Sequence, residues 1–502
     1  MNEVRFTGMR RALILTLMAA AALTLTGCGS SSSASSGNPR DTELSYFAAG
    51  TPAVALVATD PNGTAYQNAR GFLAKFPGAG FALSALESSL AGSGVNFGQD
   101  IQPLLGNPLA LGAASGASGA SAASGASASG ASAASSGASF LLVFVAKNAA
   151  KLAALVHRSG NGQSTGSYDG AKLYSGGRYS LALDGATAVL SRSSADLKRA
   201  LDRHAHGGGI TPSAYTKAIA ALPQNTLLQV YGNLSAALSA PRAAKARRVP
   251  WVAALRSYAA TVSVTDTGVT ASFRVDTTGG TLSAGQLPLP TGSGAPSVAG
   301  QAPVAVGLKD MAHVTAFGQA AVQAADPSGW AKAVASAAKD GINLHRDILS
   351  QFNGEGELDY GPGGVLARAD IRDPAAAERT LGKLKQLRRI SGGFYGDKKG
   401  STTFGGSTTV GVVGSRLVIG KAKPAVLAAF AQAPSSAVAG APGPLAFRVA
   451  LGQLVSLALA ASHSAVGANP MIQSVLKTFG QITGYAVNDP SGLHGSFTLP
   501  LK

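Results

Sequence analysis

A single cysteine carries the clearest chemistry in the sequence. Cys28 follows Leu25, Thr26 and Gly27, which is the pattern of a lipobox, where the cysteine thiol receives diacylglycerol before cleavage on its N-terminal side. This chemistry needs small residues at the cleavage point and a thiol nucleophile, and Gly27 and Cys28 supply both. Cys28 is the only cysteine in 502 residues, so the chain cannot form an intramolecular disulfide. We predict that Cys28 is the lipidated first residue of the mature protein.

The segment before Cys28 has the layout of a secretory signal. Arginines near the N-terminus give a positive start, and an uncharged apolar run over residues 12–26 follows. A transmembrane helix needs about 20 apolar residues, so this run is too short for a permanent span. A twin arginine is present, but its neighbours fit the twin-arginine export motif poorly, and general secretion is favoured. We expect a signal peptide over residues 1–27 and a flexible Ser/Gly tether over 28–40. The lipid would then anchor the chain at the extracytoplasmic face of a bacterial cell membrane.

Two Asn/Asp pairs are the best candidates for a polar site. Asn96 and Asp100 recur as Asn343 and Asp347, in GVNFGQDI and GINLHRDI. At positions i and i+4, each pair could share one helix face and bind a cation or a polar ligand. The favoured alternative is that each Asn caps a helix and each Asp faces the helix dipole in the first turn. We keep the four residues as weak ligand candidates.

Recognisable catalytic or metal-binding motifs are missing elsewhere in the sequence. His204 and His206 could donate two ligands to a metal, but no carboxylate or cysteine lies at ligand spacing. A solvated helix end is therefore the favoured interpretation of this pair. Walker loops, nucleophile elbows and zinc-protease motifs are not evident. We expect no catalytic residues, no metal site, no cofactor and no enzymatic activity.

The composition indicates a folded, basic chain. Hydrophobic residues make up 46% and charged residues 13%, which is typical of globular domains. The net charge is +17, and removal of residues 1–27 takes away three Arg and one Glu and leaves +15. This excess could favour anionic lipid headgroups or wall polymers, although solvated helix faces and loops are the favoured account of it. Nucleic acid is not expected as a partner of an exported chain. The densest basic clusters are Arg242, Lys245, Arg247 and Arg248, and Lys383, Lys385, Arg388 and Arg389.

Two stretches of biased composition interrupt the chain. Residues 112–137 contain only Gly, Ala and Ser, which cannot build a core, so we predict a disordered surface loop. Residues 277–300 are rich in Gly, Ser, Thr and Pro, and we predict a linker between domains there. The chain length suggests two or more domains.

The two halves of the chain resemble each other. Residues 94–101 match residues 341–348, and the strand-like SFLLVFV from Ser139 matches GVLARAD from Gly364. The offset between the halves falls from 247 to 225 residues across the low-complexity stretch. This change is close to the length of that stretch, so we interpret the stretch as an insertion into the first copy.

Matched elements within the copies predict the fold. Asn148 and Asp373 each follow a strand and precede a helix, as N-cap residues do, and Pro374 suits the first helical position. Strand–turn–helix segments and terminal hairpins also correspond. We predict an α+β fold of two tandem duplicated units over residues 41–276 and 301–502. Each unit would be a mostly antiparallel sheet with one face covered by helices.

Three segments of the first copy resemble a known family. They are TELSYFAAGTPAVALVATDPN from Thr42, DGATAVLSRSSADLKRALD from Asp184 and ALPQNTLLQVYGNL from Ala221. They are similar to a family of exported bacterial proteins, the domain of unknown function DUF3352. The resemblance covers most of the mature chain and implies an envelope location. It implies no catalytic residue, substrate or cofactor.

A nearly apolar segment from Leu451, LGQLVSLALAASHSAV, is predicted to be a buried core helix. A second membrane segment is the alternative, and the same apolarity leaves open a groove for a hydrophobic ligand.

Three classes of function follow from these observations. The favoured one is a non-enzymatic, lipid-anchored envelope lipoprotein that binds a ligand or partner or has a structural role. The second is a carrier of a lipid or other hydrophobic ligand, which predicts an apolar cavity between helices and sheet. The third is an envelope hydrolase without a recognisable motif, which predicts a cleft where a nucleophile and a base converge.

Overall fold

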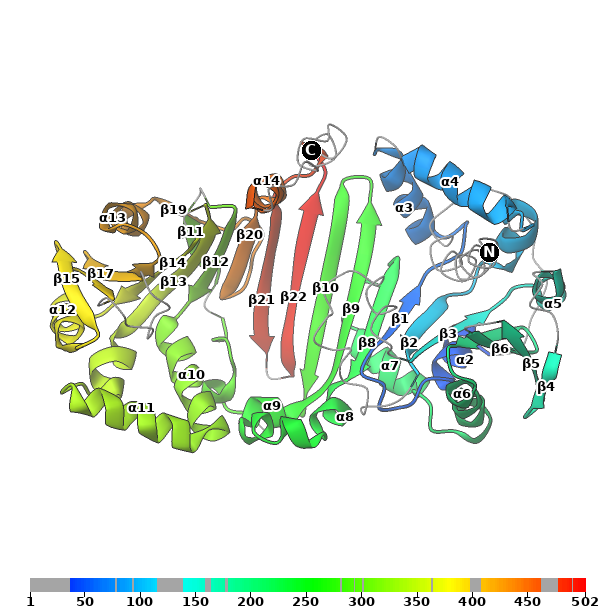
Figure 1. Ribbon diagram of the computed structural model, residues 1–502, viewed down its shortest axis with the longest axis horizontal. Helices are drawn as coiled ribbons and strands as arrows, with labels where there is room; N and C mark the ends of the chain where they lie inside the picture. Colours follow the sequence, from blue (N-terminus) through cyan, green and yellow to red (C-terminus); the bar gives the residue numbers. More distant parts are fainter. Residues whose placement is uncertain are drawn as a thin grey trace, which may run out of the picture. The chain divides into compact units, whose positions relative to one another are not determined.

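The structure is a computed structural model of an α+β chain with two compact units (Figure 1). Unit 1 contains the residues up to Pro241 and Arg256–Arg274, and unit 2 contains Arg242–Leu255 and Val275–Lys502. The structure describes residues 37–502 except 77–78, 93, 115–138, 159–163, 177–178, 280–281, 293, 300–301, 363, 398–407, 462–476 and 490.

Unit 1 is built on an antiparallel sheet. In sheet order its strands are β10 (Gly268–Thr277), β9 (Leu255–Thr265), β8 (Leu228–Asn233), β1 (Val54–Val57), β2 (Leu109–Ala113), β3 (Phe140–Val145), β7 (Thr187–Ser191), β6 (Tyr179–Asp184), β5 (Ala171–Gly176) and β4 (Ser164–Tyr168). Antiparallel ladders join the neighbours from β9 to β4. Since β1 lies between β2 and β8, the first strand of the unit is central in its sheet.

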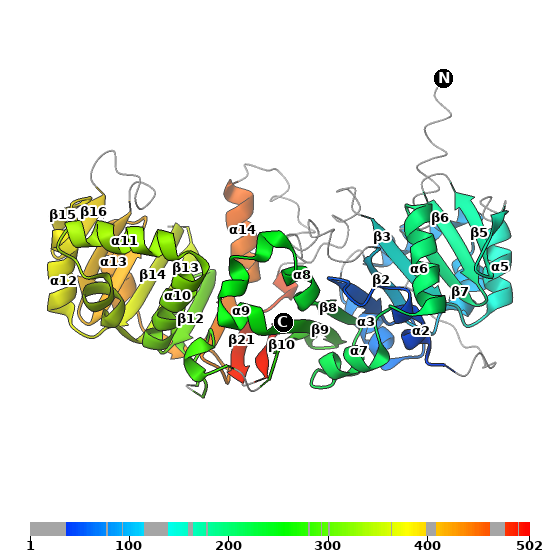
Figure 2. The ribbon, with the colours of Figure 1, turned by 90° about the horizontal axis from the view of Figure 1, so that it is seen from below.

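Helices cover both faces of this sheet, whereas we predicted one covered face. One face packs against α2 (Pro39–Ser45), α6 (Ser194–His206) and α7 (Pro212–Ile219), and the other against η1 (Phe97–Ile101), η2 (Gln102–Leu104) and α5 (Ala149–Arg158). Figure 2 shows α6 beside β6 and β7. The reason is visible in β3, where Val143 is buried on one face and Phe144 on the other. A strand with two apolar faces needs cover on both. The remaining helices of unit 1 include α3 (Thr64–Ala74), α4 (Ala79–Ala91) and α8 (Leu234–Leu238).

The strands of unit 2 pair with one another in antiparallel order. In sheet order its strands are β22 (Gly492–Pro500), β21 (Ile482–Asp489), β20 (Leu445–Val449), β12 (Val304–Lys309), β13 (Phe352–Gly361), β14 (Gly364–Ile371), β18 (Arg416–Gly420), β17 (Thr409–Val413), β16 (Phe394–Asp397) and β15 (Leu387–Ser391). A separate two-stranded sheet joins β11 (Ser297–Ala299) to β19 (Ser435–Ala437).

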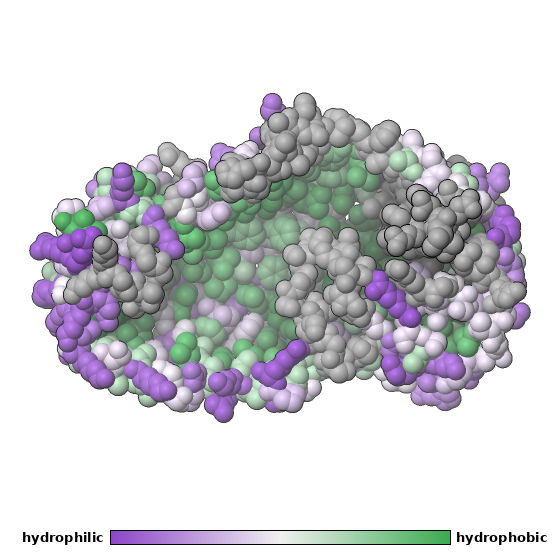
Figure 3. All heavy atoms as spheres, in the orientation of Figure 1, coloured by the Kyte–Doolittle hydropathy of each residue, from purple (hydrophilic) through white to green (hydrophobic). Residues whose placement is uncertain are grey.

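The helices of unit 2 cover its sheet unevenly. They include α9 (Pro250–Ala254), α10 (Met311–Ala325), α11 (Pro327–Lys339), η9 (Leu344–Ile348), η10 (Leu349–Gln351), α12 (Pro374–Lys383), α13 (Pro424–Gln432) and α14 (Leu451–Ala461). The helices α12 and α13 bury apolar side chains against β14, β17 and β18. By contrast, α10 and α11 bury none of their residues. Hydrophobic residues gather at the surface over β12, β20 and β21 (Figure 3).

The order of strand pairing is the same in both units. In each, the first strand pairs with the second strand and with a late strand, and the next strands follow in matching succession. The segments that match in sequence, around Ser139 and Gly364, form β3 and β14. The tandem duplication itself stays a prediction, which this recurring order supports.

Capping explains where several helices begin. The side chain of Asn148 accepts a hydrogen bond from the amide of Lys151 at 2.9 Å, at the start of α5. Asp373 accepts from the amide of Ala376 at 2.9 Å, and Pro374 is the first residue of α12. Both predicted caps are confirmed. Each satisfies an amide that the first helical turn leaves without an intrahelical partner.

The structure differs from the sequence prediction at two boundaries. Residues 277–300, which we predicted as a linker, include β11, which pairs with β19, and Val298 within it is buried. Of the low-complexity stretch 112–137, residues 112–113 belong to β2 and the residues beyond 114 lie outside the described part of the chain. Apolar residues embedded in the biased composition account for β11.

The N-terminal predictions fall largely outside the described residues. The signal peptide, Cys28 and the tether up to residue 36 are not described, and α2 begins at Pro39, inside the predicted tether. The predicted buried helix from Leu451 is α14, but none of residues 451–457 is buried, which corrects that prediction. Within the described chain, the structure has no helix with the length and apolarity needed to span a membrane.

Candidate ligand-binding cavity

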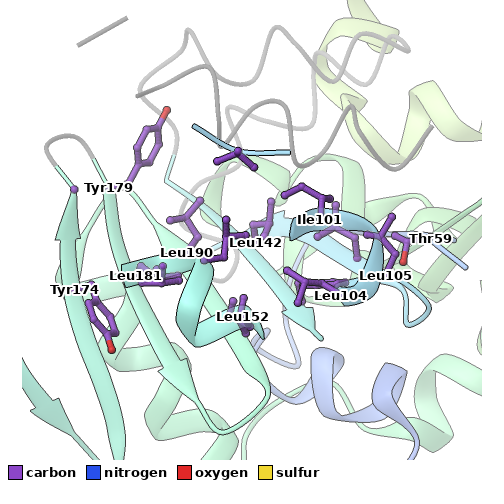
Figure 4. A pocket seen from close by; sticks show the side chains of 17 residues that line it. Thr59, Ile101, Leu104, Leu105, Leu142, Leu152, Tyr174, Tyr179, Leu181 and Leu190 are labelled. Atoms are coloured by element: carbon purple, nitrogen blue, oxygen red, sulfur yellow. The ribbon is translucent and has the colours of Figure 1, made fainter. Parts of the chain in front are cut away.

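An apolar cavity of about 100 Å³ lies in unit 1, between the sheet and the helices of one face (Figure 4). Its walls come from β2, β3, β5, β6 and β7 on one side and from η1, η2 and α5 on the other. The described residues that line it are Thr59, Val95, Ile101, Leu104, Leu105, Leu109, Leu142, Phe144, Leu152, Leu155, Val156, Tyr174, Gly176, Tyr179, Leu181, Ala188 and Leu190.

Strand register places the sheet residues of the cavity on one face. Leu142 pairs directly with Leu190, and Leu190 pairs with Leu181 on the next strand. Directly paired residues of antiparallel strands point to the same side of the sheet. The cavity therefore has a floor of branched aliphatic side chains that runs across β3, β7 and β6.

The helical wall is built by apolar residues at helical spacing. Leu152, Leu155 and Val156 of α5 are buried and face the cavity, since residues three and four apart share one face of a helix. Leu104 is fully buried, and Leu105 follows it directly at the end of η2. These side chains close the cavity on the side away from the sheet.

Polar groups at the cavity are few, and the hydroxyl of Thr59 is already engaged. The Thr59 hydroxyl donates to the carbonyl of Asn107 and accepts from the amide of Gly106 at 3.2 Å. The ring of Tyr179 packs edge-on against Phe140, with centroids 6.1 Å apart. Among the described lining residues there is no Asp, Glu, His, Lys, Arg, Cys or Ser. The lining offers apolar contact and holds no acid–base pair or nucleophile of these types.

The size of the cavity limits what it can hold. An engineered cavity of about 150 Å³ lined by Leu, Ile and Phe stays free of water and binds benzene. The cavity of unit 1 has a similar lining and about 100 Å³. It therefore suits a small apolar group, such as the end of an acyl chain.

The first Asn/Asp pair lies next to this cavity. Asn96 immediately precedes η1, and Asp100 lies within it. The side chain of Asn96 accepts from the amide of Gln99 at 3.0 Å, and Asp100 accepts from the amide of Asn96 at 2.8 Å. Arg158 also donates to Asp100, at 2.5 Å. Burial opposes ionisation of Asp100, but these hydrogen bonds outweigh it and lower its pKa. The oxygens are thus used within the chain, as helix capping requires.

The second pair has the same geometry in unit 2. Asn343 accepts from the amide of Arg346 at 2.9 Å, and Asp347 accepts from the amide of Asn343 at 2.8 Å. The side chain of Arg346 donates to Asp347 and, with the Asn343 amide, lowers the pKa of that carboxyl to about 2. The two pairs lie in different units, and each has the contacts of a helix cap. A ligand role for these four residues stays a prediction.

The two histidines near residue 205 lie apart from the cavity lining. The ring of His204 stacks on Tyr46 with centroids 4.3 Å apart, and its Nδ1 lies 2.6 Å from the hydroxyl of Ser45. His206 is exposed, and its Nδ1 lies 3.2 Å from the carbonyl of Asp202. Within the described chain, no group of three or more His, Cys, Asp or Glu side chains could hold a metal ion.

Sequence reasoning anticipated an apolar cavity as one option but did not assign its residues. The available signals were the uninterrupted apolar run of β3 and the apolar spacing of α5, both consistent with a filled core. What distinguishes a cavity from a core is a small deficit in side-chain volume. That deficit depends on how strands and helices are spaced and leaves no mark in the periodicity of either.

Comparisons with known proteins give a family but no activity. A family model described as "Protein of unknown function (DUF3352)" matches residues 11–406. Solved structures of TP0453 in crystal forms III and IV are similar at a TM-score of 0.26 and 8% identity. The first match covers 48% of this chain and 82% of that chain, and the second covers 47% and 80%. A likeness at this level carries no argument about function. No curated protein matches the chain.

Proposed function

This chain belongs to the family of proteins of unknown function DUF3352, and from that premise we propose that it is an exported, lipid-anchored protein that binds a hydrophobic ligand. The observation that carries the proposal is the apolar cavity of unit 1, whose described lining contains no charged residue. Transfer of an apolar group from water into such a cavity is favourable, because it removes apolar surface on both partners from water. The lining supports binding better than hydrolysis, since it has no nucleophile–base arrangement.

The anchor rests on the sequence around Cys28. The signal-like segment, the lipobox pattern and the single thiol support lipidation and export to the extracytoplasmic face of a bacterial membrane. Diacylglycerol places two acyl chains on the protein, and two chains suffice for stable anchoring. A hydrophobic-ligand site would then lie close to a store of lipids, at the end of a short tether.

The basic surface supports contact with an anionic membrane or wall. All members of the two basic clusters of unit 2 are exposed: Arg242, Lys245, Arg247, Arg248, Lys383, Lys385, Arg388 and Arg389. A basic residue near an anionic surface contributes about 1 kcal/mol of attraction. We propose anionic lipid headgroups or acidic wall polymers as partners of this surface.

Lipidation of Cys28 is expected to be directly observable. Intact-mass and peptide mass spectrometry of the protein taken from cell membranes should show an N-terminal residue 28 that carries diacylglycerol. An unmodified Cys28 thiol, or a peptide that spans residues 20–36 intact, would contradict the anchor but leave the cavity proposal standing.

A polar residue in the cavity is expected to weaken ligand binding. Leu181 on β6 lines the cavity and is only partly buried, so Leu181→Gln should fold. Loss of most of one leucine contact should weaken binding of benzene, a ligand of the size that this cavity can hold, about tenfold. The measurement is a calorimetric titration of the chain from residue 28 with Cys28→Ser, which has no lipid of its own.

Leu173→Gln provides the matched control. Leu173 lies on the neighbouring strand β5, is also partly buried, and packs against the core of the opposite sheet face. It should leave the affinity for benzene unchanged. Equal losses in both variants, or saturable binding unaffected by Leu181→Gln, would refute the cavity as the ligand site.

A further inference from the structure

The sheet of unit 2 exposes an apolar face across five neighbouring strands. Val306 on β12 pairs with Leu358 on β13 and with Phe447 on β20. The row continues through Gly484 on β21 to Phe497 on β22. Directly paired residues share one side of a sheet, so these side chains form a continuous surface. We call it the open face, and its apolar members are Val304, Val306, Leu308, Leu358, Tyr360, Leu445, Phe447, Val449, Ile482 and Phe497.

Burial on this sheet is the reverse of the usual pattern. Leu358, Tyr360 and Phe497 are 43%, 40% and 40% exposed, and none of the ten apolar side chains named above is buried. The small side chain of Ala486, which pairs with Leu445 on the same side, is 6% exposed. On the other side of β13, the charged Glu357 and Asp359 are 6% and 5% exposed. Soluble proteins ordinarily place charged residues outside and rarely leave a large apolar patch in water. An exposed face of this kind marks an interaction site for a protein, a membrane or a ligand.

The helices beside the open face leave it accessible. Met311 at the start of α10 packs over Gly356 of β13, but neither α10 nor α11 buries a residue. Figure 3 shows hydrophobic residues at the surface over β12, β20 and β21. The face is therefore an apolar surface that α10 covers only at its β13 edge.

The chemistry of the open face fits a hydrocarbon chain. Its rows contain aliphatic side chains and no charged residue. They also contain Phe447 and Phe497, whose ring centroids lie 6.5 Å apart on either side of Gly484. Five strands about 4.8 Å apart extend about 19 Å. One leaflet of a bilayer core is about 15 Å deep, which is the reach of one lipid tail. The face is long enough to hold such a tail across the strands.

We propose that the open face of unit 2 binds an acyl chain of a membrane phospholipid. This site is separate from the cavity of unit 1, which is about 100 Å³ and takes only a small apolar group. The two proposals rest on different residues in different units and can fail independently. The ligand here lies along the sheet surface, held by apolar contact over its length.

Photo-crosslinking tests this site on the full-length protein. The protein is reconstituted into vesicles of phosphatidylcholine and phosphatidylglycerol that contain a trace of phosphatidylcholine with a diazirine in its acyl chain. After irradiation, peptide mass spectrometry locates the adducts. The expected result is adducts on peptides that contain β12, β13 and β20. Leu358→Glu, which places a carboxylate at an already exposed position, should reduce those adducts about tenfold, because an unpaired charge resists transfer into hydrocarbon.

Val426→Glu is the matched control, because Val426 is 47% exposed on α13, away from the open face. It should leave the adducts unchanged. Absence of adducts from β12, β13 and β20 overturns the proposal, as does equal loss in both variants. Protein–protein crosslinks at these strands in place of lipid adducts also overturn it, since they assign the face to a second copy. Adducts on the cavity residues of unit 1 report separately on the proposed function.

Discussion

Glu43→Gln is expected to raise the free energy of unfolding of unit 1 by about 3 kcal/mol at pH 7 and to leave it unchanged at pH 4.5. Glu43 lies on α2, is fully buried, and accepts a hydrogen bond from the amide of Val145 at 3.3 Å. Its second carboxyl oxygen has no hydrogen-bond partner among the described residues. Burial raises the pKa of Glu43 from 4.5 to about 9, so the side chain is neutral in the folded protein at pH 7.

The direction of the pH effect follows from this raised pKa. Between pH 4.5 and about 9, the folded chain holds a proton that the unfolded chain has released. Stability is therefore complete below pH 4.5 and falls by about 1.4 kcal/mol per pH unit as the pH rises toward 9. Glutamine keeps the shape and an acceptor for the Val145 amide but has no proton to lose. The variant should remove this slope.

Hydrogen exchange of peptides from β1, β2 and β3 in a urea series between pH 4.5 and 9 measures this effect in unit 1. Glu378→Gln on α12, where the glutamate is only partly buried, is the matched control and should change stability by less than about 0.5 kcal/mol. A pH slope that persists in Glu43→Gln would show that Glu43 is ionised in the fold and would contradict the account of its burial.

The sequence was sufficient to predict the elements and their succession. Strand patterns around Ser139 and Gly364, and caps at Asn148 and Asp373, identified β3, β14, α5 and α12 at nearly the observed positions. These signals are local, because hydrophobic periodicity and capping depend on residues within a few positions of each other. They do not depend on how the strands pair.

The candidate sites could not be predicted, because they depend on which face of each strand is covered. In GVLARAD, alternation separates Leu366, Arg368 and Asp370 from the apolar residues between them. The usual rule would place Arg368 in solvent, yet Arg368 is 5% exposed and Val365 is 50% exposed. Periodicity shows that a strand has two faces, but the packing of α13 decides which one is buried.

Arg368→Met is expected to lower the free energy of unfolding of unit 2 by about 3–5 kcal/mol, the largest single effect we predict. The Arg368 side chain pairs with Glu357 at 2.6 Å, and both are buried. It also donates to the carbonyl of Phe430 at 2.7 Å, at the end of α13. Methionine fills similar space but leaves the Glu357 carboxylate buried without its partner and the helix end without a donor. Urea unfolding monitored by hydrogen exchange of β13, β14 and α13 measures the loss.

Two further variants separate the buried charge from simple packing. Arg379→Met removes an exposed arginine whose nearest carboxylate, on Asp373, lies 4.0 Å away, and it should cost less than about 1 kcal/mol. The double variant Glu357→Leu/Arg368→Met removes both buried charges and should recover most of the loss, because well-packed apolar residues can replace a buried pair at little cost. A double variant as unstable as Arg368→Met alone would contradict an electrostatic cause.

Acid should also reduce the cost of Arg368→Met, because it neutralises Asp359, which Arg368 favours in its ionised form. Burial and the neighbouring Glu357 already raise the pKa of Asp359 to about 7. The folded state thus binds a proton that the unfolded chain loses near pH 4, and stability falls as the pH rises from about 4 to about 7. In Arg368→Met the positive charge that favours ionisation of Asp359 is gone, so this carboxyl should hold its proton to higher pH. The deficit relative to the wild-type chain should therefore be smaller at pH 5 than at pH 8. A deficit independent of pH would assign the loss to the missing contacts with α13.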